Sequence, residues 1–215
     1  MGRVLQAAPP SYSLESIQQA GRALLAGGVA IFPTETVYGI GADIRNAAAV
    51  SRVFLLKGRD PARPLMAHCA SPVQMLDYVA EVPPVVQPLI SRFWPGPLAL
   101  IFRRTDRVAD AAVGGGETIG IRMVGHPVAR DLIEELGAPI AGTSANLTGE
   151  PATSRFDIIN PRLLEQADVA LDAGTCGRDV PSTVLDVTCR PPRIVRVGAV
   201  SVQDIESIVG RVSQA

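Results

Sequence analysis

Stretches with strand and helix patterns alternate along most of this 215-residue chain, and that alternation limits the folds open to it. Apolar runs of strand length, such as "VAIFP" and "PLALIFR", are separated by stretches with helical periodicity. This pattern is typical of an α/β domain with a largely buried sheet. Two runs near the end, "STVLDV" and "RIVRVG", follow each other without a helix, so we expect a mixed sheet. No repeat or linker divides the chain, and we expect a single domain over residues 1–215 with a structured core at about 13–210.

The expected helices carry start and stop signals. Asn46 is a candidate N-cap for a helix that stops at Gly58, and Ser71 and Ser201 are placed to cap two others. Gly137 is placed to end "HPVARDLIEEL". In "SLESIQQAGRALLAGG" the apolar spacing predicts a core-facing stripe made of Leu14, Ile17, Ala20, Leu24 and Leu25.

The composition argues against several classes of protein. A formal net charge of −1, with five Phe, three Tyr and one Trp, is unsuited to tight RNA binding. The three cysteines, Cys69, Cys176 and Cys189, are odd in number and widely spaced, which resembles neither a disulfide framework nor a zinc site. No apolar run reaches the roughly 18 residues of a membrane span. We therefore expect a protein of the reducing cytoplasm with no membrane partner.

Several familiar catalytic motifs are absent. A P-loop needs Ser or Thr after its lysine, whereas Gly58 follows Lys57. "GIGADI" lacks the third glycine of a dinucleotide fingerprint, and "GTSAN" has Asn146 where a nucleophile elbow has glycine. With only His68 and His126 in the chain, a Ser/His/Asp triad or a His/Cys metal site has few ways to form.

Lys57 is the only lysine among 20 basic residues. It stands with Arg59 at the C-terminal end of an expected helix, where the helix dipole favours any cation, so capping is one interpretation. Arginine would serve that role equally well. A compact ammonium on a flexible stem instead suits a single phosphate oxygen, so the second interpretation, which we favour, is a site for triphosphate charge.

Other polar clusters follow expected strands, namely "PTETVYGIG", "GTSAN", "PSTV" and "RVG", although Ser, Thr and Asn turns would give similar patterns. Arg122 lies within the apolar run "IGIRMV" and must be paired, either with a substrate carboxylate or phosphate or with an internal Asp or Glu. His68 in "LMAHCA" is either a satisfied core histidine or a hydrogen-bonding residue of a pocket.

Taken in order, "PTETVYGIG", "KGR" followed by "RPL", "GTSAN", "PSTV" and "RVG" resemble the YrdC family of threonylcarbamoyl-AMP synthases. The resemblance extends from residue 33 to residue 198 and includes a Lys-x-Arg and a Ser-x-Asn pattern. Family members often have proline directly after that arginine, whereas this chain has Asp60. The resemblance implies an open, strongly twisted mixed α/β sheet with flanking helices and a concave cleft, in the short form that lacks an additional C-terminal domain.

The resemblance also implies a reaction in which L-threonine, bicarbonate and ATP form threonylcarbamoyl-AMP and pyrophosphate. Magnesium would come with ATP, with no tightly bound protein metal. The catalytic cations would be Lys57 and Arg59, and the ATP site would consist of Lys57, Arg59, Thr118, Ser144, Asn146 and Arg196. The threonine site would consist of Thr34, His68, Arg122 and Ser182.

The implied product is used by a downstream threonylcarbamoyl-transferase complex that makes N6-threonylcarbamoyladenosine in tRNA, and we expect any direct tRNA contact to be weak. Two rival functions remain open from the sequence. One is a relative of the same fold with another nucleotide-linked activity, including the corresponding domain of carbamoyl-transfer enzymes. The other is a non-catalytic RNA-binding module.

Overall fold

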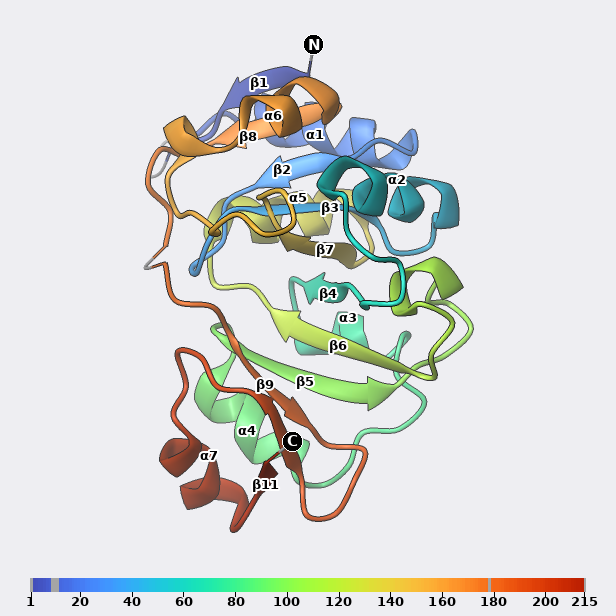
Figure 1. The fold of residues 1–215 in the computed structure, drawn as a ribbon, viewed down its shortest axis with the longest axis vertical. Helices are drawn as coiled ribbons and strands as arrows, with labels where there is room; N and C mark the ends of the chain where they lie inside the picture. Colours follow the sequence, from blue (N-terminus) through green and yellow to red (C-terminus); the bar gives the residue numbers. More distant parts are fainter. Residues whose placement is uncertain (1, 9–11, 178, 215) are drawn as a thin grey trace.

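The computed structural model describes residues 2–8, 12–177 and 179–214, and its strands form one sheet in the order β1-β8-β2-β3-β7-β4-β6-β5-β9-β10-β11. The strands are β1 (Arg3–Gln6), β2 (Ala30–Phe32), β3 (Gly39–Asp43), β4 (Met66–Cys69), β5 (Leu98–Arg103), β6 (Thr118–Met123), β7 (Ile140–Ser144), β8 (Val169–Asp172), β9 (Thr183–Asp186), β10 (Arg193–Arg196) and β11 (Ser213–Gln214). Figure 1 shows them stacked along the long axis of the molecule, from β1 and β8 at one end to β9 and β11 at the other.

Parallel and antiparallel pairs occur together in this sheet, which confirms the predicted mixed α/β fold. β9 and β10 are antiparallel, as the two adjacent strand patterns suggested, and β2 and β3 form an antiparallel hairpin. β3 also pairs with β7, so the "PTETVYGIG" turn belongs to a hairpin in the interior of the sheet. β1 pairs with β8, and β11 with β10, so the sheet extends beyond the expected core at both ends.

Helices cover the sheet. They are α1 (Leu14–Leu25), α2 (Ala47–Lys57), α3 (Pro72–Met75), α4 (Val86–Phe93), α5 (Pro127–Leu136), α6 (Pro161–Gln166) and α7 (Val202–Val209), with short 3-10 turns η1 (Asp110–Val113) and η2 (Phe156–Ile158). Of these, α2, α3, α5 and α7 begin or end at the residues that the sequence indicated. The side chains of Asn46, Ser71 and Ser201 accept backbone N–H bonds at the starts of α2, α3 and α7. α2 and α5 end at Gly58 and Gly137, both in the left-handed conformation with φ of 60° and 69°. Among the described residues, no helix is long and apolar enough to cross a membrane.

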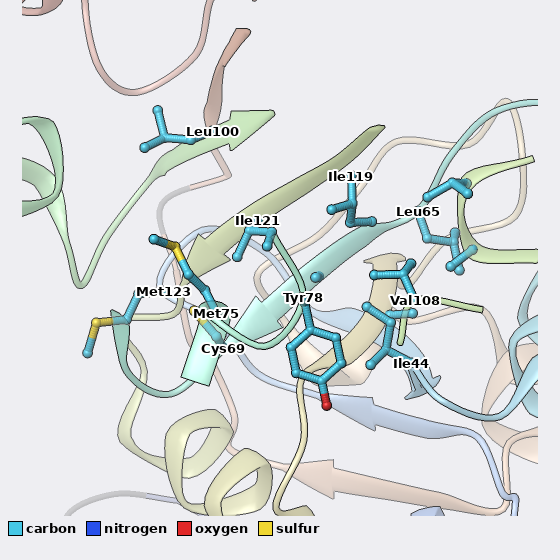
Figure 2. Close-up of a cluster of buried hydrophobic side chains, with 14 of the residues drawn as sticks. Ile44, Leu65, Cys69, Met75, Tyr78, Leu100, Val108, Ile119, Ile121 and Met123 are labelled. Atoms are coloured by element: carbon cyan, nitrogen blue, oxygen red, sulfur yellow. The ribbon is translucent and has the colours of Figure 1, made fainter. Parts of the chain in front are cut away.

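Two hydrophobic clusters form the core because successive residues of each strand face opposite sides of the sheet. Ala30 and Phe32 belong to the smaller cluster, under α1 and α5, whereas Ile31 belongs to the larger one on the other side. Figure 1 shows α2 and α6 in front of this end of the sheet and α1 and α5 behind it. Figure 2 shows part of the larger cluster, where Tyr78 from the segment after α3 lies among side chains of β4 and β6.

The predicted stripe on α1 is partly wrong. Ile17, Ala20 and Leu24 are buried, but Leu14 and Leu25 are 65% and 55% exposed. Both exposed leucines lie at the ends of the helix, whereas Gly21, farther inside it, packs against Glu135 of α5. At this crossing a Cβ on Gly21 would come within 2.4 Å of a side-chain carbon of Glu135, so close packing and not leucine spacing decides the contact face.

Candidate functional site

A cleft of about 410 Å³ opens on the face of the sheet opposite the larger hydrophobic cluster. Ala67 and Ile121 point into that cluster, whereas His68 and Arg122, which are partners in the β4–β6 ladder, line the cleft. The strand alternation therefore places polar side chains on the opposite face from their apolar neighbours. Among the predicted site residues, those lining the cleft are Thr34, Arg59, His68, Arg122, Ser144, Asn146, Ser182 and Arg196.

Lys57 lies beside this cleft and is 3% exposed. Its Nζ donates to the backbone oxygens of Ser144 and Asn146, the latter at 2.5 Å, and to Asn146 Oδ1 at 3.3 Å. An ammonium has three N–H donors, so these acceptors occupy all of them. Lys57 therefore does not cap its own helix, because Gly58 is the C-cap. The charged ammonium instead binds the "GTSAN" turn.

The backbone makes the same connection between α2 and the "GTSAN" turn. Thr148 N donates to Lys57 O at 2.9 Å, and Asn146 Nδ2 donates to Glu150 O at 2.7 Å. The Lys-x-Arg and Ser-x-Asn segments are thus one bonded unit, although they are about ninety residues apart. In this arrangement Lys57 fixes the turn that presents Ser144 and Asn146 to the cleft.

Two arginines form a cationic wall of the cleft. Arg59 Nε donates to Arg63 O at 3.1 Å and its Nη2 to Pro64 O at 3.0 Å, so the guanidinium is held on its own loop. Arg196 donates to Ser182 O from Nε and Nη2, at 3.1 and 2.9 Å, and to Ser182 Oγ at 3.0 Å. Burial lowers the pKa of both arginines, and neighbouring guanidinium groups lower it further, yet arginine stays charged in proteins. The wall is therefore suited to an anion.

Arg122 lines the cleft and is 3% exposed. Its Nη1 donates to Glu35 Oε1 at 2.7 Å and to Thr36 Oγ1 at 3.2 Å, while Gly125 N donates to Glu35 Oε2 at 2.8 Å. The internal carboxylate considered from the sequence is thus present. The Nε of Arg122 is buried and has no hydrogen-bond partner among the described residues. This is unusual for a charged group, and a hydrogen bond to a ligand oxygen would satisfy it.

Thr34 and His68 differ in how free they are to meet a ligand. Thr34 Oγ1 contacts Thr36 Oγ1 at 2.9 Å and donates to Val37 O at 2.6 Å, so it shapes the turn after β2. His68 Nδ1 lies 3.4 Å from Ile140 O, and its ring packs edge-on against Phe32. Burial, followed by the charge of Arg122, lowers the pKa of His68 to about 3. The imidazole is therefore neutral at physiological pH and can act only as a hydrogen-bonding group.

Thr118 is a predicted ATP residue that the structure does not bring to the cleft lining. It begins β6 opposite Arg103 of β5 and does not line the cleft, although strand alternation places it on the same face as Arg122.

Sequence reasoning assigned no role to several residues at the site. Glu35 and Thr36 stand inside the quoted "PTETVYGIG" motif, yet only the strand order reveals that they hold Arg122. Arg63 and Glu150 also line the cleft. Arg63 belongs to the "RPL" motif, which contributed to the family resemblance without a role being assigned to this arginine.

Lys57 makes the cleft sensitive to pH. Burial, and then the charge of Arg59, lowers the pKa of Lys57 from 10.5 to about 8. The charged form is present below that value, so a reaction rate or an anion affinity that depends on this charge should fall with a slope of one proton above about pH 8. The stability contribution has the opposite sign: burying the ammonium costs stability below pH 8, and this cost is relieved between pH 8 and 10.5. Rate profiles and urea unfolding across pH 7.5 to 10 measure both; a flat rate profile contradicts the role of the charge.

Comparisons with known proteins agree with this arrangement. The Sua5/YciO/YrdC family model, described as "Telomere recombination", matches residues 22–198. The threonylcarbamoyl-AMP synthases of Pyrococcus abyssi and Bacillus subtilis are 37% and 38% identical over 86% and 90% of this chain. The matches cover 55% and 56% of those proteins, so this chain spans about half the length of these relatives.

A solved structure of P. abyssi Sua5 complexed with L-threonine superposes with a TM-score of 0.94 at 33% identity. The match covers 100% of this chain and 62% of that chain. The family model alone covers most of the sequence, including every motif from "PTETVYGIG" to "RVG". The chain therefore belongs to the Sua5/YciO/YrdC family.

Proposed function

We propose that the protein is an L-threonylcarbamoyladenylate synthase, a nucleotidyltransferase that forms threonylcarbamoyl-AMP and pyrophosphate from L-threonine, bicarbonate and ATP. The observation that carries this proposal is that arginines in two different settings line one cleft. Arg59 and Arg196 form a cationic wall near the Ser144–Asn146 turn, and Arg122 has an unpartnered buried Nε. A triphosphate suits the first, and the carboxylate of a small amino acid suits the second.

The threonine end of the cleft is proposed around Arg122. Its Nη1 is engaged by Glu35, so a substrate carboxylate would approach the other edge of the guanidinium, where Nε is free. The imidazole of His68 and the hydroxyl of Ser182 line the same cleft and could meet the substrate amine and hydroxyl. Polar groups built for a hydroxyl reject an analogue that lacks it, so valine should be a poor substrate.

The nucleotide end is proposed at the "GTSAN" turn and the arginine wall, with Lys57 fixing the turn. The threonine amine and bicarbonate combine to a carbamate with loss of water. A carbamate oxygen then forms a bond to the α-phosphorus of ATP, the bond from that phosphorus to the bridging oxygen breaks, and pyrophosphate leaves. An anion here attacks an anion, so the protein contributes positive charge and alignment more than a nucleophile of its own.

Magnesium is proposed to enter with ATP. Of the described residues lining the cleft, Glu150 supplies the single carboxylate, and its oxygens accept bonds from Leu147 N at 3.3 Å and Asn160 Nδ2 at 2.9 Å. This donor set fits an ion held chiefly by substrate phosphates, which is usual for Mg²⁺. When bound, the ion would neutralise part of the triphosphate charge.

The proposed product is an activated acyl adenylate, so it needs an acceptor enzyme. We propose that a downstream threonylcarbamoyl-transferase complex uses it to modify tRNA in the cytoplasm. The net charge of −1 favours transfer by such a partner over tight tRNA binding by this chain.

Pyrophosphate release with ATP, magnesium, L-threonine and bicarbonate tests the proposed reaction. We expect release to require both threonine and bicarbonate, and to fall strongly when valine replaces threonine. Release that is independent of threonine and bicarbonate would instead support a relative with another nucleotide-linked activity. An RNA-binding module would show no release and would bind RNA in the same buffer.

A further inference from the structure

The segment that joins β8 to β9 crosses the turn between β2 and β3. Six strands lie between β8 and β9 in the sheet, and Figure 1 shows the connection passing along one side of it. The structure describes residues 173–177 and 179–182 of this crossing segment. Ala173 N donates to Tyr38 Oη at 2.9 Å, and Tyr38 Oη donates to Gly174 O at 3.1 Å. The crossing segment is therefore bound to the β2–β3 turn from its first residues.

Gly177 of the crossing segment lies against the backbone of Thr36, in the same turn. A Cβ on Gly177 would overlap the carbonyl carbon and oxygen of Thr36. Both are backbone atoms, which cannot rotate away as the end of a long side chain can, so this close approach requires glycine. Farther along, Asp179 N donates to Thr36 O at 3.2 Å. The crossing segment thus meets the Thr36 carbonyl at two points.

Asp179 is fixed by its backbone conformation and by its side chain. Its φ of 57° lies in the left-handed region, which aspartate and asparagine adopt more readily than other residues with a side chain. Its Oδ1 accepts a bond from Ser154 N at 2.6 Å, and Ser154 O accepts one from Cys176 N at 2.9 Å. Ser154 is buried, so this anchor lies in the interior. The side chain of Asp179 therefore holds the crossing segment where its own N–H reaches Thr36.

Thr36 connects the crossing segment to Arg122. Its Oγ1 accepts a bond from Arg122 Nη1 at 3.2 Å and lies 2.9 Å from Thr34 Oγ1. The neighbouring residue Glu35 accepts a bond from the same Nη1 at 2.7 Å. A displacement of the Thr36 backbone would therefore move both acceptors that orient the guanidinium of Arg122.

The other end of the crossing segment is anchored independently. Arg196 donates to the backbone oxygen and the hydroxyl of Ser182, and Ala199 N donates to Pro181 O at 3.0 Å. The proline ring also restricts the backbone between this anchor and the contact with Thr36. We therefore expect a displacement at Thr36 to leave the cationic wall of the cleft in place.

We propose that Gly177 and Asp179 are positioning residues for the amino-acid end of the cleft, which act through Thr36 on the guanidinium of Arg122. The assignment of this end to threonine rests on the proposed function. Neither Gly177 nor Asp179 is among the residues that line the cleft. Their contribution is to keep the free edge of Arg122 aimed at the substrate carboxylate, and a shift of about 1 Å is enough to remove such a geometric contribution.

Calorimetric titration with L-threonine tests this proposal without turnover, and titration with sodium tripolyphosphate reports on the cationic wall. Gly177→Ala should weaken threonine binding at least about tenfold, because Thr36 has to move away from the new Cβ. Its affinity for tripolyphosphate should stay within about twofold of the unchanged protein. Gly210→Ala is the control: φ is 76° at this position after α7, and a Cβ there would meet open space. It should lower the stability and leave both affinities unchanged.

Two Asp179 variants separate the hydrogen bond from the charge. Asp179→Asn and Asp179→Ala both remove the negative charge, but asparagine keeps an acceptor for Ser154 N and tolerates the left-handed conformation. Asp179→Asn should bind threonine within about twofold of the unchanged protein and Asp179→Ala about tenfold more weakly, with the tripolyphosphate affinity unchanged in both. A role in stability alone would lower the free energy of unfolding of Asp179→Ala in urea without changing the threonine affinity of the folded protein.

A folded Gly177→Ala protein with a threonine affinity within about twofold of the unchanged protein would overturn the proposal. Equal losses of threonine and tripolyphosphate affinity would also overturn it, as would equal threonine affinities in the two Asp179 variants or no binding of threonine by the unchanged protein. If Gly177→Ala does not fold, the two Asp179 variants decide. Failure of the proposed function gives a different pattern: threonine binds with an affinity that depends on Gly177 and Asp179, while threonine-dependent pyrophosphate release is absent.

Discussion

Lys57→Arg is expected to lower threonine- and bicarbonate-dependent pyrophosphate release by at least about a hundredfold, a loss of the size caused by removing one electrostatic contact in an active site. Lys57 is 3% exposed, and its ammonium binds three acceptors on the "GTSAN" turn. The larger, planar guanidinium cannot place three donors at these positions without moving the turn. Ser144 and Asn146 would then leave the geometry that we propose for nucleotide binding.

Two companion variants show whether this effect comes from the site or from unfolding. Lys57→Ala should lose at least as much activity and also destabilise the fold by about 1–3 kcal/mol, because buried carbonyls lose their donor. Arg22→Lys makes an Arg/Lys exchange at an exposed position of α1 and should leave the rate unchanged. Steady-state rates together with urea unfolding separate the cases. Normal turnover in a folded Lys57→Arg protein would make the single lysine an accident of composition.

Arg122→Lys is expected to raise the KM for threonine by roughly ten- to a hundredfold, in line with the loss of a charge-assisted bidentate contact. Arg122 has to bind Glu35 through Nη1 and still offer its other edge to a carboxylate. A lysine ammonium can bind Glu35 but has no second edge in a fixed plane. Removing the charge altogether would leave Glu35 unpaired, so lysine is the better probe.

The affinity for tripolyphosphate and the KM for threonine, measured together, show which end of the cleft the Arg122→Lys substitution affects. The affinity for tripolyphosphate should change little in Arg122→Lys, because the arginine wall is intact. Arg103→Lys, on the exposed end of the neighbouring strand β5, should leave both the threonine KM and the polyphosphate affinity unchanged. A weakened polyphosphate affinity with a normal threonine KM would move Arg122 to the nucleotide end of the cleft.

Local features of this fold could be predicted from the sequence because local chemistry determines them. The N-caps at Asn46, Ser71 and Ser201 and the glycine ends of α2 and α5 depend on a few neighbouring residues, and all agree with the structure. The mixed sheet followed from the order of strand patterns. The burial of Leu14 and Leu25 was predicted wrongly because it depends on how far α5 extends along α1.

The sequence predicted which residues belong to the candidate site, but it did not predict which of them contact one another. The Arg122–Glu35 pair joins residues 87 positions apart, and it forms because β3, β7, β4 and β6 are neighbours in the sheet. The same strand order brings Lys57 to the "GTSAN" turn, where its ammonium meets carbonyl oxygens and not an open cleft. Such pairings depend on topology, which no local pattern encodes.

The identity of the product is the most direct test of the central claim that one cleft joins three substrates. The measurement is mass spectrometry of the reaction mixture with ¹³C-bicarbonate, L-threonine and ATP. The account predicts an adenylate that contains the threonine mass and one labelled carbon, formed together with an equal amount of pyrophosphate and lost in Lys57→Arg. An adenylate without the labelled carbon, or release of pyrophosphate without any adenylate, would contradict it.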